Sequence, residues 1–407
     1  MRYLTLLFPL LLSAQQLTLV DKLTQEPLLN ATFIQGSNAV KSNAQGVVDF
    51  EPSTATAHVK AYGYRPFHWD LNNTTKRLEI EPIKVKGLYL SFWGASPKTK
   101  TFKNVIKKID TTEANALIID VKSEQGMMSY KTNVKAASAM DAHYYRTIKD
   151  ISSYMEYLKE KKIYTIARIV CFKDELSAKN HPERAVKRSN GTVWRNAAKM
   201  AWVDPFDPKA QDYIISIAVD AAQKGFDEIN FDYVRFPAKA DLRFSQENNQ
   251  ENRLKAIEHF IHKASLALRP YGVFLSVDTF GDIVWNGGND SNIGHRIDVL
   301  QKHADYLAPM LYPSGFHSGI LGLKDPAKEP YHVIYESLIR MEKEVEPVRL
   351  RPWLQYFKDY AFSRKHYNNY EIREQIRASD DANCSGWLLW NPSSRYKRGG
   401  LLPTAQK

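Results

Sequence analysis

The sequence predicts an α/β protein, a (β/α)8 TIM barrel preceded by a small all-β sandwich. From Val85 to the end of the 407-residue chain, buried apolar segments alternate eight times with amphipathic segments. Strands that alternate with helices form a parallel sheet covered by helices, and eight such units match a closed barrel better than an open doubly wound sheet. No G-x-G-x-x-G motif follows the first of these strands, so a dinucleotide-binding fold lacks its fingerprint.

Residues 1–14, MRYLTLLFPLLLSA, are predicted to be a secretory signal peptide. Arg2 precedes an apolar run that ends in the small residues Ser13 and Ala14. The run is shorter than the roughly 20 residues that a membrane span requires, and a buried N-terminal strand is the alternative interpretation. No later stretch approaches 18 consecutive apolar residues. We therefore expect an exported protein, periplasmic or extracellular, without stable membrane insertion.

Residues 15–84 are predicted to form the β-sandwich domain, because short alternating segments are separated there by turn-rich pieces. The order T-x-E-P-L-x-N-A, S-N-A-Q-G-V-V-D-F and V-K-A-Y-G-Y-R-P resembles the carboxypeptidase-regulatory-like, transthyretin-like domains. This domain shows no catalytic constellation. It is interpreted either as an accessory module that presents substrate or as a spacer.

Residues 85–407 are predicted to form the barrel. Its strands are expected at 85–93, 116–126, 164–172, 228–237, 273–281, within 297–314, at 349–357 and at 386–392. Helices are expected at 101–114, 147–162, in the later part of 204–225, and at 250–272, 331–345 and 370–384; in the first of them, apolar residues recur at helical spacing. A long insertion at 173–202 precedes the third of these helices, and it either caps a cleft or is a solvated decoration.

Three carboxylates are expected at the open rim of this barrel, because the active sites of TIM barrels lie at the C-terminal ends of the strands. Asp120, Asp232 and Asp278 come near the ends of the second, fourth and fifth strands, and we predict that they are catalytic. Cleavage of a glycosidic bond needs two carboxyl groups, one to protonate the leaving oxygen and one to stabilise or attack the anomeric carbon. Neighbouring strands lie about 4.8 Å apart, so Asp232 and Asp278 fit the ~5–5.5 Å of double displacement; loop geometry leaves retention or inversion open.

Other side chains at the strand ends are predicted to bind the substrate. Tyr and Trp rings stack on the flat faces of sugars, whereas a large core is the alternative use of so many aromatic residues. The residues assigned to substrate binding are Lys122, Arg168, Trp202, Tyr233, Arg235, Tyr312, Trp353, Gln355 and Trp390. Arg235 is expected to keep Asp232 ionised. The structural alternative is a ring of permanent ion pairs between the three carboxylates and Arg168, Lys122 and Arg235.

Composition and motifs argue against several other functions. The formal net charge of +11 fits an acidic surface or a polyanionic substrate, but no basic run or nucleic-acid-binding motif is present, so we expect no nucleic-acid partner. The histidines lack metal-ligand spacing and no G-x-S-x-G occurs, so neither a metal site, a cofactor nor a serine nucleophile is expected. Cys171 and Cys384 are expected at opposite ends of the barrel, too far apart for a disulfide.

Several motifs together resemble the glycoside-hydrolase-like domain family DUF4015. They are W-V-D-P-F-D-P at 202–208, G-F-D-E-I-N-F-D-Y-V-R-F-P at 225–237, L-S-V-D-T-F-G at 275–281, A-P-M-L-Y-P-S at 308–314 and G-W-L-L-W-N-P at 386–392. The resemblance spans about residues 86–400 and implies a TIM barrel related to glycosidases. By analogy with α-amylase-like barrels, it implies that Asp232 is the nucleophile and Asp278 the acid/base.

The function predicted from the sequence is therefore an exported glycoside hydrolase. Its expected partner is a carbohydrate, and the basic charge balance favours an acidic cell-envelope or extracellular polysaccharide. The alternative is a carbohydrate-binding barrel that has lost hydrolysis. Replacement of Asp232 by Asn separates the two, because only a hydrolase has turnover to lose.

Overall fold

The computed structural model describes residues 15–73, 75–397 and 399–404. The predicted signal peptide at 1–14 lies outside these residues. The chain divides into two compact units: residues up to Pro82 together with Arg269–Gly272, and Ile83–Leu268 together with Val273 onward. Among the described helices, none combines the length and the apolarity that a membrane span requires.

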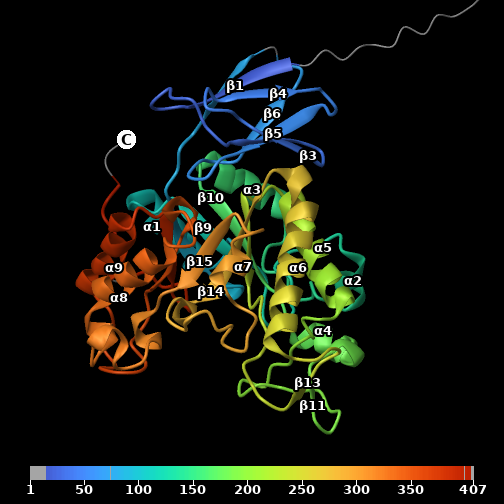
Figure 1. Cartoon of the computed structure of the whole chain (residues 1–407), viewed down its shortest axis with the longest axis vertical. Helices are drawn as coiled ribbons and strands as arrows, with labels where there is room; N and C mark the ends of the chain where they lie inside the picture. Colours follow the sequence, from blue (N-terminus) through green and yellow to red (C-terminus); the bar gives the residue numbers. More distant parts are fainter. Residues whose placement is uncertain (1–14, 74, 398, 405–407) are drawn as a thin grey trace, which may run out of the picture. The chain divides into compact units, whose positions relative to one another are not determined.

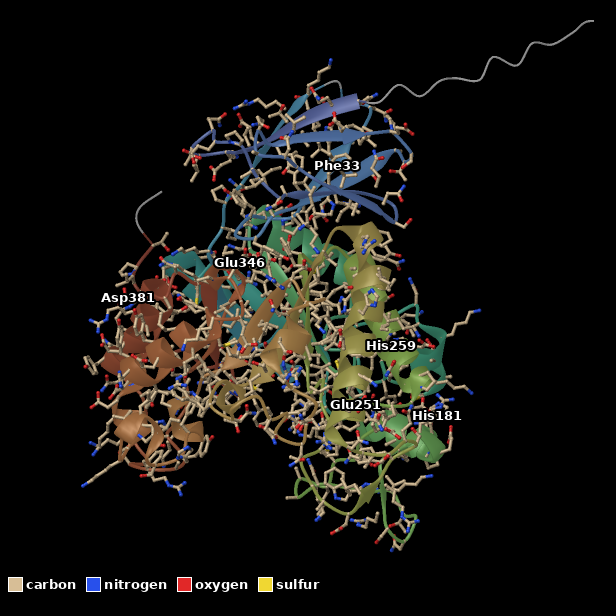
Figure 2. The ribbon with its side chains drawn as sticks, in the orientation of Figure 1. Phe33, His181, Glu251, His259, Glu346 and Asp381 are labelled. Carbon is tan, nitrogen blue, oxygen red and sulfur yellow. The ribbon has the colours of Figure 1, made fainter. Side chains whose placement is uncertain are left out.

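The N-terminal unit contains two small β-sheets that share one hydrophobic core. One sheet has the order β4-β1-β7 and the other β3-β2-β5-β6. Phe33 of β2 packs against Phe50 of β4 and Trp69 of β6, so side chains from both sheets meet in this core (Figure 2). The strands are β1 Gln15–Asp21, β2 Thr32–Gln35, β3 Asn38–Lys41, β4 Val47–Phe50, β5 Thr56–Lys60, β6 Phe67–Asp70 and β7 Arg77–Ile80. The predicted small β domain is confirmed, and its transthyretin-like resemblance stays a prediction.

The second unit is a closed barrel of eight parallel strands, as predicted. Figure 1 shows some of these strands, among them β9, β10, β14 and β15, with helices beside them. The strands follow one another around the barrel in chain order, and β17 closes the ring by pairing with β8. They are β8 Val85–Leu90, β9 Ala116–Lys122, β10 Tyr164–Val170, β12 Glu228–Asp232, β14 Phe274–Phe280, β15 Tyr306–Met310, β16 Trp353–Gln355 and β17 Gly386–Trp390. Their runs are buried on both faces, as expected for strands that lie between a packed interior and a layer of helices.

Helices follow the strands and cover the barrel. The helices are α1 Lys100–Thr111, α2 Lys135–Ala139, α3 Ile151–Glu160, α4 Glu175–Asn180, α5 Pro208–Gln223, α6 Gln250–Leu268, α7 Ile297–Leu300, α8 Pro330–Met341 and α9 Asn369–Asp381. Several begin at side-chain caps: Thr99, Asp150, Asp174 and Asp207 each accept a backbone N–H of the first turn. Asn368 and Glu371 form a capping box at α9. The polar residues between strand and helix thus fix where these five helices start.

Short elements fill the loops. The two-residue strands β11 Lys187–Arg188 and β13 Leu242–Arg243 pair with each other, which ties the long insertion to the loop after β12. The 3-10 helices of this unit are η1 Trp93–Ala95, η2 Pro182–Arg184, η4 Gly281–Val284, η5 Pro313–Gly315, η6 Ile320–Gly322, η7 Pro326–Lys328 and η8 Pro347–Arg349, and η3 is Arg269–Tyr271.

The barrel interior is layered along its axis. At the N-terminal end, Glu228 of β12 pairs with Arg351, and Tyr164 of β10 donates a hydrogen bond to Glu228. Apolar side chains such as Ile118 and Ala308 also pack in the barrel interior. Charged side chains return at the C-terminal ends of the strands.

Two strand ends differ from the sequence prediction. The fourth strand stops at Asp232, because Tyr233 takes a left-handed conformation (φ 51°), so Arg235 and Pro237 lie beyond the strand. The seventh strand is reduced to Trp353–Gln355, directly after Pro352, which has no N–H to give to a neighbouring strand. Cys171 and Cys384 are both buried and free, as predicted.

Candidate active site

A pocket lies at the C-terminal ends of the barrel strands, where the carboxylates were predicted. Ten residues line it: Arg168, Asp232, Tyr233, Arg235, Asp278, Phe280, Met310, Tyr312, Trp353 and Trp390. Two predicted catalytic residues, Asp232 and Asp278, therefore share this pocket with six of the residues assigned to substrate binding. Asp120, Lys122, Trp202 and Gln355 are not among its lining residues.

Strand register explains why Asp232 and Asp278 meet. Phe231 of β12 is paired with Val277 of β14. Asp232 and Asp278 are the next residues on these two strands, so they lie at the same height in the barrel. Side chains alternate along a strand, which places Asn230 and Asp232 on the same face of β12. Tyr233, with its left-handed backbone, donates its N–H to Asp232 Oδ1 at 2.6 Å. A left-handed Tyr is rare and costs energy, and such residues cluster at functional sites.

Arg168 of β10 links Asp232 to Asp120 of β9. Its Nη1 donates a hydrogen bond to Asp120 Oδ1 at 2.5 Å, and its Nε and Nη2 both donate to Asp232 Oδ2, the Nε at 3.1 Å. Burial alone would lower the pKa of Arg168, but the negative charges of Asp120 and Asp232 outweigh this and raise it well above its ordinary value. The guanidinium is therefore a fixed positive charge beneath the pocket.

Asp120 serves as the second anchor of this guanidinium. Its Oδ2 accepts hydrogen bonds from the hydroxyl of Tyr89 at 2.6 Å and from the backbone N–H of Phe92 at 3.3 Å. With both oxygens engaged and no place in the pocket lining, Asp120 is positioned to orient Arg168. Asp120 therefore fits the alternative interpretation given above, in which the carboxylate is part of a permanent ion pair.

Asp278 has a different environment. Its Oδ1 accepts hydrogen bonds from Asn230 Nδ2 at 2.8 Å and from the indole Nε1 of Trp353 at 2.7 Å. Among the described residues it forms no ion pair, and its Oδ2 has no hydrogen-bond partner. Burial, and next the negative charge of Asp232, raise the pKa of Asp278 well above the usual range, against the opposing effects of its two donors and Arg168. The raised pKa favours the protonated form of Asp278, which lies beside Asp232 in the same pocket.

Tyr312 places a phenol hydroxyl beside this pair. Burial, followed by the negative charges of Asp278 and Asp232, raises its pKa well above the ordinary value, so it stays neutral. Trp353 and Trp390 also line the pocket, with their rings 5.5 Å apart at 88°, and Tyr89 packs behind them, 3.9 Å from the ring of Trp390. These faces match the flat apolar faces of a sugar ring.

Arg235 does not pair with Asp232, contrary to the role expected from the sequence; Arg168 has that role. The Arg235 guanidinium lies over the rings of Phe280, Trp202 and Tyr233, at 4.7, 4.9 and 5.1 Å. Its one hydrogen bond within the described residues is from Nη1 to the carbonyl oxygen of Phe236, 3.0 Å away. Burial lowers its pKa. A guanidinium without a carboxylate partner is thus presented at the pocket wall.

A second pocket adjoins the first and contains Trp202. It shares Arg235 and Phe280 with the first pocket, and Trp194 of the insertion lines it as well. Its volume is about 460 Å³, against about 170 Å³ for the first pocket, so most of the free space lies on the insertion's side of Arg235. The insertion therefore contributes to the wall of the site.

Lys122 and Gln355 were both assigned to substrate binding, but their side chains are buried and form bonds to other protein groups. Lys122 is fully buried, with its Nζ 2.8 Å from Asp174 Oδ2 and 2.6 Å from the carbonyl oxygen of Val170. A register shift between β9 and β10 separates Asp120 from Lys122, so their spacing of two does not put them in one site. Gln355 exchanges hydrogen bonds with Ser314 and Gln375.

Sequence reasoning missed residues of the site that support the named ones. Asn230 and Tyr89 donate hydrogen bonds to Asp278 and Asp120, and Phe280 and Met310 line the pocket. Asn230 had a usable signal, because it lies two residues before Asp232 on a buried strand and so shares its face. Within the described ranges, no three His, Cys, Asp or Glu side chains gather as metal ligands would, and His181 and His259 belong to different helical regions (Figure 2).

The comparisons with known proteins decide the family. A family model described as "Putative glycosyl hydrolase domain", DUF4015, matches residues 87–396, which covers most of the chain and every strand of the barrel except the start of β8. The chain belongs to the DUF4015 family. The sequence resemblance is thereby confirmed for the barrel, and the carboxylates described above lie within the matched DUF4015 residues. No curated protein sequence matches the chain.

Solved structures resemble the DUF4015 barrel. The glycoside hydrolase domain of PgaB (BpsB) from Bordetella bronchiseptica aligns with a TM-score of 0.53 and 12% identity, over 77% of this chain and 95% of that one. A hypothetical protein from Ruminiclostridium thermocellum is 33% identical over 47% of this chain and 96% of that one, with a TM-score of 0.42. At 12% identity, the likeness to the PgaB domain supports the fold alone.

Proposed function

We propose that the barrel is a glycoside hydrolase in which Asp278 is the general acid/base and Asp232 is the carboxylate that acts on the anomeric carbon. The observation that carries this proposal is the contrast between two neighbouring carboxyl groups in one pocket. Asp232 faces the fixed charge of Arg168, whereas Asp278 has no cation partner among the described residues and has a raised pKa. Acid/base cleavage of a glycoside needs two carboxyl groups in different roles, one that donates a proton and one that acts as a carboxylate.

The chemistry follows from these states. Neutral Asp278 gives its proton to the glycosidic oxygen, and the bond between this oxygen and the anomeric carbon breaks as the leaving group departs. Asp232 offsets the positive charge that develops on the sugar ring. Asp278, now ionised, takes a proton from water as the water adds to the anomeric carbon. Asn230 and Trp353 hold Asp278 Oδ1 in place, which leaves Oδ2 for the proton.

The proposed substrate is an acidic polysaccharide of the cell envelope or the extracellular space. Its support is the net charge of +11 and the guanidinium of Arg235, which lines the pocket without a carboxylate partner within the described residues. Arg is the side chain best suited to bind a carboxylate or phosphate group. The N-terminal β unit is proposed as an accessory module for the same substrate.

A carbohydrate-binding barrel without turnover is the second candidate. The ion pair between Arg168 and Asp232 favours it, because a carboxylate engaged by a buried cation is a weaker nucleophile. This candidate predicts sugar binding in the same pocket and no released fragments.

A screen with matched variants tests both candidates. The purified protein and its Asp232→Asn and Asp278→Asn variants are incubated with soluble starch, glycol chitin, xylan, carboxymethylcellulose, polygalacturonate and peptidoglycan, and released fragments are read by mass. We expect fragments from at least one polymer with the unchanged protein and none above background with either variant. Fragments released equally by all three proteins would exclude this pair as the catalytic groups.

A further inference from the structure

We propose that Trp93, Tyr144 and Tyr145 form an aromatic platform at the barrel rim that binds a polysaccharide chain outside the catalytic pocket. This inference rests on the proposed function, because it gives the substrate a second binding region. None of the three residues lines either pocket described above. The ligand class is a chain of several sugar rings, of which one ring occupies the pocket while others lie on the platform.

The platform is exposed to an unusual degree for aromatic side chains. Trp93 is 58% exposed, Tyr144 68% and Tyr145 53%. The three rings also touch: Trp93 lies 5.7 Å from Tyr145, and Tyr145 lies 4.7 Å from Tyr144. Single exposed apolar residues are normal, whereas a contiguous exposed group indicates a binding surface.

A side-chain hydrogen bond and ring packing hold the Trp93 part of the platform in place. Trp93 belongs to η1, where Gly94 and Ala95 are buried and the hydroxyl of Thr99 donates to the carbonyl oxygen of Gly94 at 2.9 Å. The ring of Trp93 also packs edge-on against buried Phe92, at 5.1 Å. The aromatic surface is therefore preorganised on this side, which lowers the entropy lost when a ligand binds.

The segment that bears Tyr144 and Tyr145 is anchored on both sides. Before it, the N–H of Met128 donates to the carbonyl oxygen of Ala142 at 2.7 Å; after it, the N–H of Ile148 donates to the carbonyl oxygen of Ser129 at 2.8 Å. Met128 itself bridges to Lys122, the last residue of β9. The segment with both tyrosines is thus hydrogen-bonded to residues that pair with the C-terminal end of β9.

Position links the platform to the proposed active site. Trp93 follows β8 and the tyrosines lie between β9 and α3, so all three come from loops at the C-terminal ends of the strands, where TIM-barrel sites are built. The residue before Trp93, Phe92, donates its N–H to Asp120, the anchor of Arg168. One hydrogen-bonded network therefore joins the backbone of the platform to the charged groups of the pocket.

Sugar chemistry fits this surface. The flat faces of pyranose rings carry C–H groups that stack on Trp and Tyr, while the tyrosine hydroxyls can bond to sugar hydroxyls. Binding energy from sugar rings remote from the cleaved bond can be used to position that bond. A long polymer is therefore expected to gain more from the platform than a short oligosaccharide does.

The test uses the full chain with Asp232→Asn, so that no probe is consumed. Binding to the six polymers named above is measured by retardation in native gels that contain each polymer. We expect at least one polymer to retard the chain, and Trp93→Ala or Tyr145→Ala to weaken this binding by about tenfold. Trp93→Phe should retain most of it. Tyr157→Ala is the matched control, because Tyr157 is 38% exposed on α3 and should not affect binding.

The platform proposal is wrong if Trp93→Ala and Tyr145→Ala bind every retarding polymer as tightly as the parent, or if no polymer retards the chain. Hydrolysis with Asp232 intact is measured separately. Binding that depends on Trp93 without any hydrolysis would sink the enzyme proposal and leave the platform standing. If Trp93→Ala hydrolyses the polymer with an unchanged KM, the platform proposal is wrong and the enzyme proposal stands.

Discussion

At the scale of single residues, the proposed mechanism depends on the different environments of two aspartates. Arg168 donates to Asp232, while Asn230 and Trp353, both uncharged, donate to Asp278. A buried carboxyl without a cation prefers its neutral form. The proposal therefore assigns proton donation to Asp278 and the role of the ion-paired carboxylate to Asp232, although both are the same residue type on neighbouring strands.

Asp278→Asn is expected to abolish hydrolysis of any polymer that the protein cleaves, with a loss in kcat of about 10²–10⁴. The amide keeps an oxygen for Asn230 and Trp353 to donate to, but it has no proton to give. The measurement is the initial rate of fragment release across pH. With the unchanged protein, activity should fall as pH rises through the raised pKa of Asp278, because the acid form is then lost. If the residual activity of Asp278→Asn still falls as pH rises, the decline in activity belongs to a group other than Asp278.

The same substitution is expected to stabilise the fold at neutral pH. Because folding raises the pKa of Asp278, the stability linked to this group is complete below its unfolded pKa of about 3.9 and is lost as pH rises through the folded value. Asn avoids this loss. The Tm of Asp278→Asn should therefore exceed that of the unchanged protein increasingly as pH rises. Exposed Asp241→Asn is the control, and an equal rise in Tm for both variants would contradict the explanation.

Arg168→Met is expected to destabilise the protein by about 3–5 kcal/mol, because two buried carboxylates lose their shared cation. The matched control is Arg195→Met, which removes a solvent-exposed ion pair with Glu175 and should cost about 0–1 kcal/mol. Urea unfolding at neutral pH measures both. Similar losses for the two variants would mean that the buried network contributes no more than a surface pair.

At the scale of elements, the barrel closes where β17 meets β8, and Gly386 makes this possible. Its φ is 119°, and a Cβ at this position would lie 2.0 Å from the carbonyl oxygen of Val85, its partner in the pairing. Gly386→Ala is expected to destabilise the chain by about 2–5 kcal/mol, from a disfavoured backbone conformation together with overpacking. Gly191→Ala, with a φ of 83° and no atom near its Cβ, should show the backbone cost alone. Equal losses in urea unfolding would show that the contact with Val85 is easily relieved.

The strands of the barrel were predictable, but the pairing of its charges was not. Buried parallel strands leave continuous apolar runs in the sequence, and Asp232 and Asp278 mark where two of those runs end. Arg235 is close to Asp232 in sequence, but the ion-pair partner of Asp232 is Arg168, which comes from another strand. Lys122 was misplaced because a register shift in β9 leaves no sequence signature. Contacts between strands depend on register, which local patterns do not encode.

At the scale of the whole molecule, the two units have different roles in the proposal. The barrel unit contains each group proposed as catalytic and nearly all of the matched family segment. The N-terminal unit supplies a core of its own between two small sheets. Charge is a property of the entire chain, and an excess of +11 favours encounters with anionic polymers at low ionic strength. An exported protein would meet such polymers in the cell envelope.

Export is the last prediction, and it depends on residues 1–14. When the full chain is produced in a Gram-negative bacterial host, we expect it in the periplasmic fraction with Gln15 as its N-terminal residue, because an apolar run after Arg2 is read as a signal and removed at Ala14. Leu11→Arg places a charge within that run and should keep the uncleaved chain in the cytoplasm. N-terminal sequencing of both fractions measures this. An uncleaved, cytoplasmic chain without the substitution would show that the run is not a signal, and the envelope polysaccharide would then lose its standing as the proposed substrate.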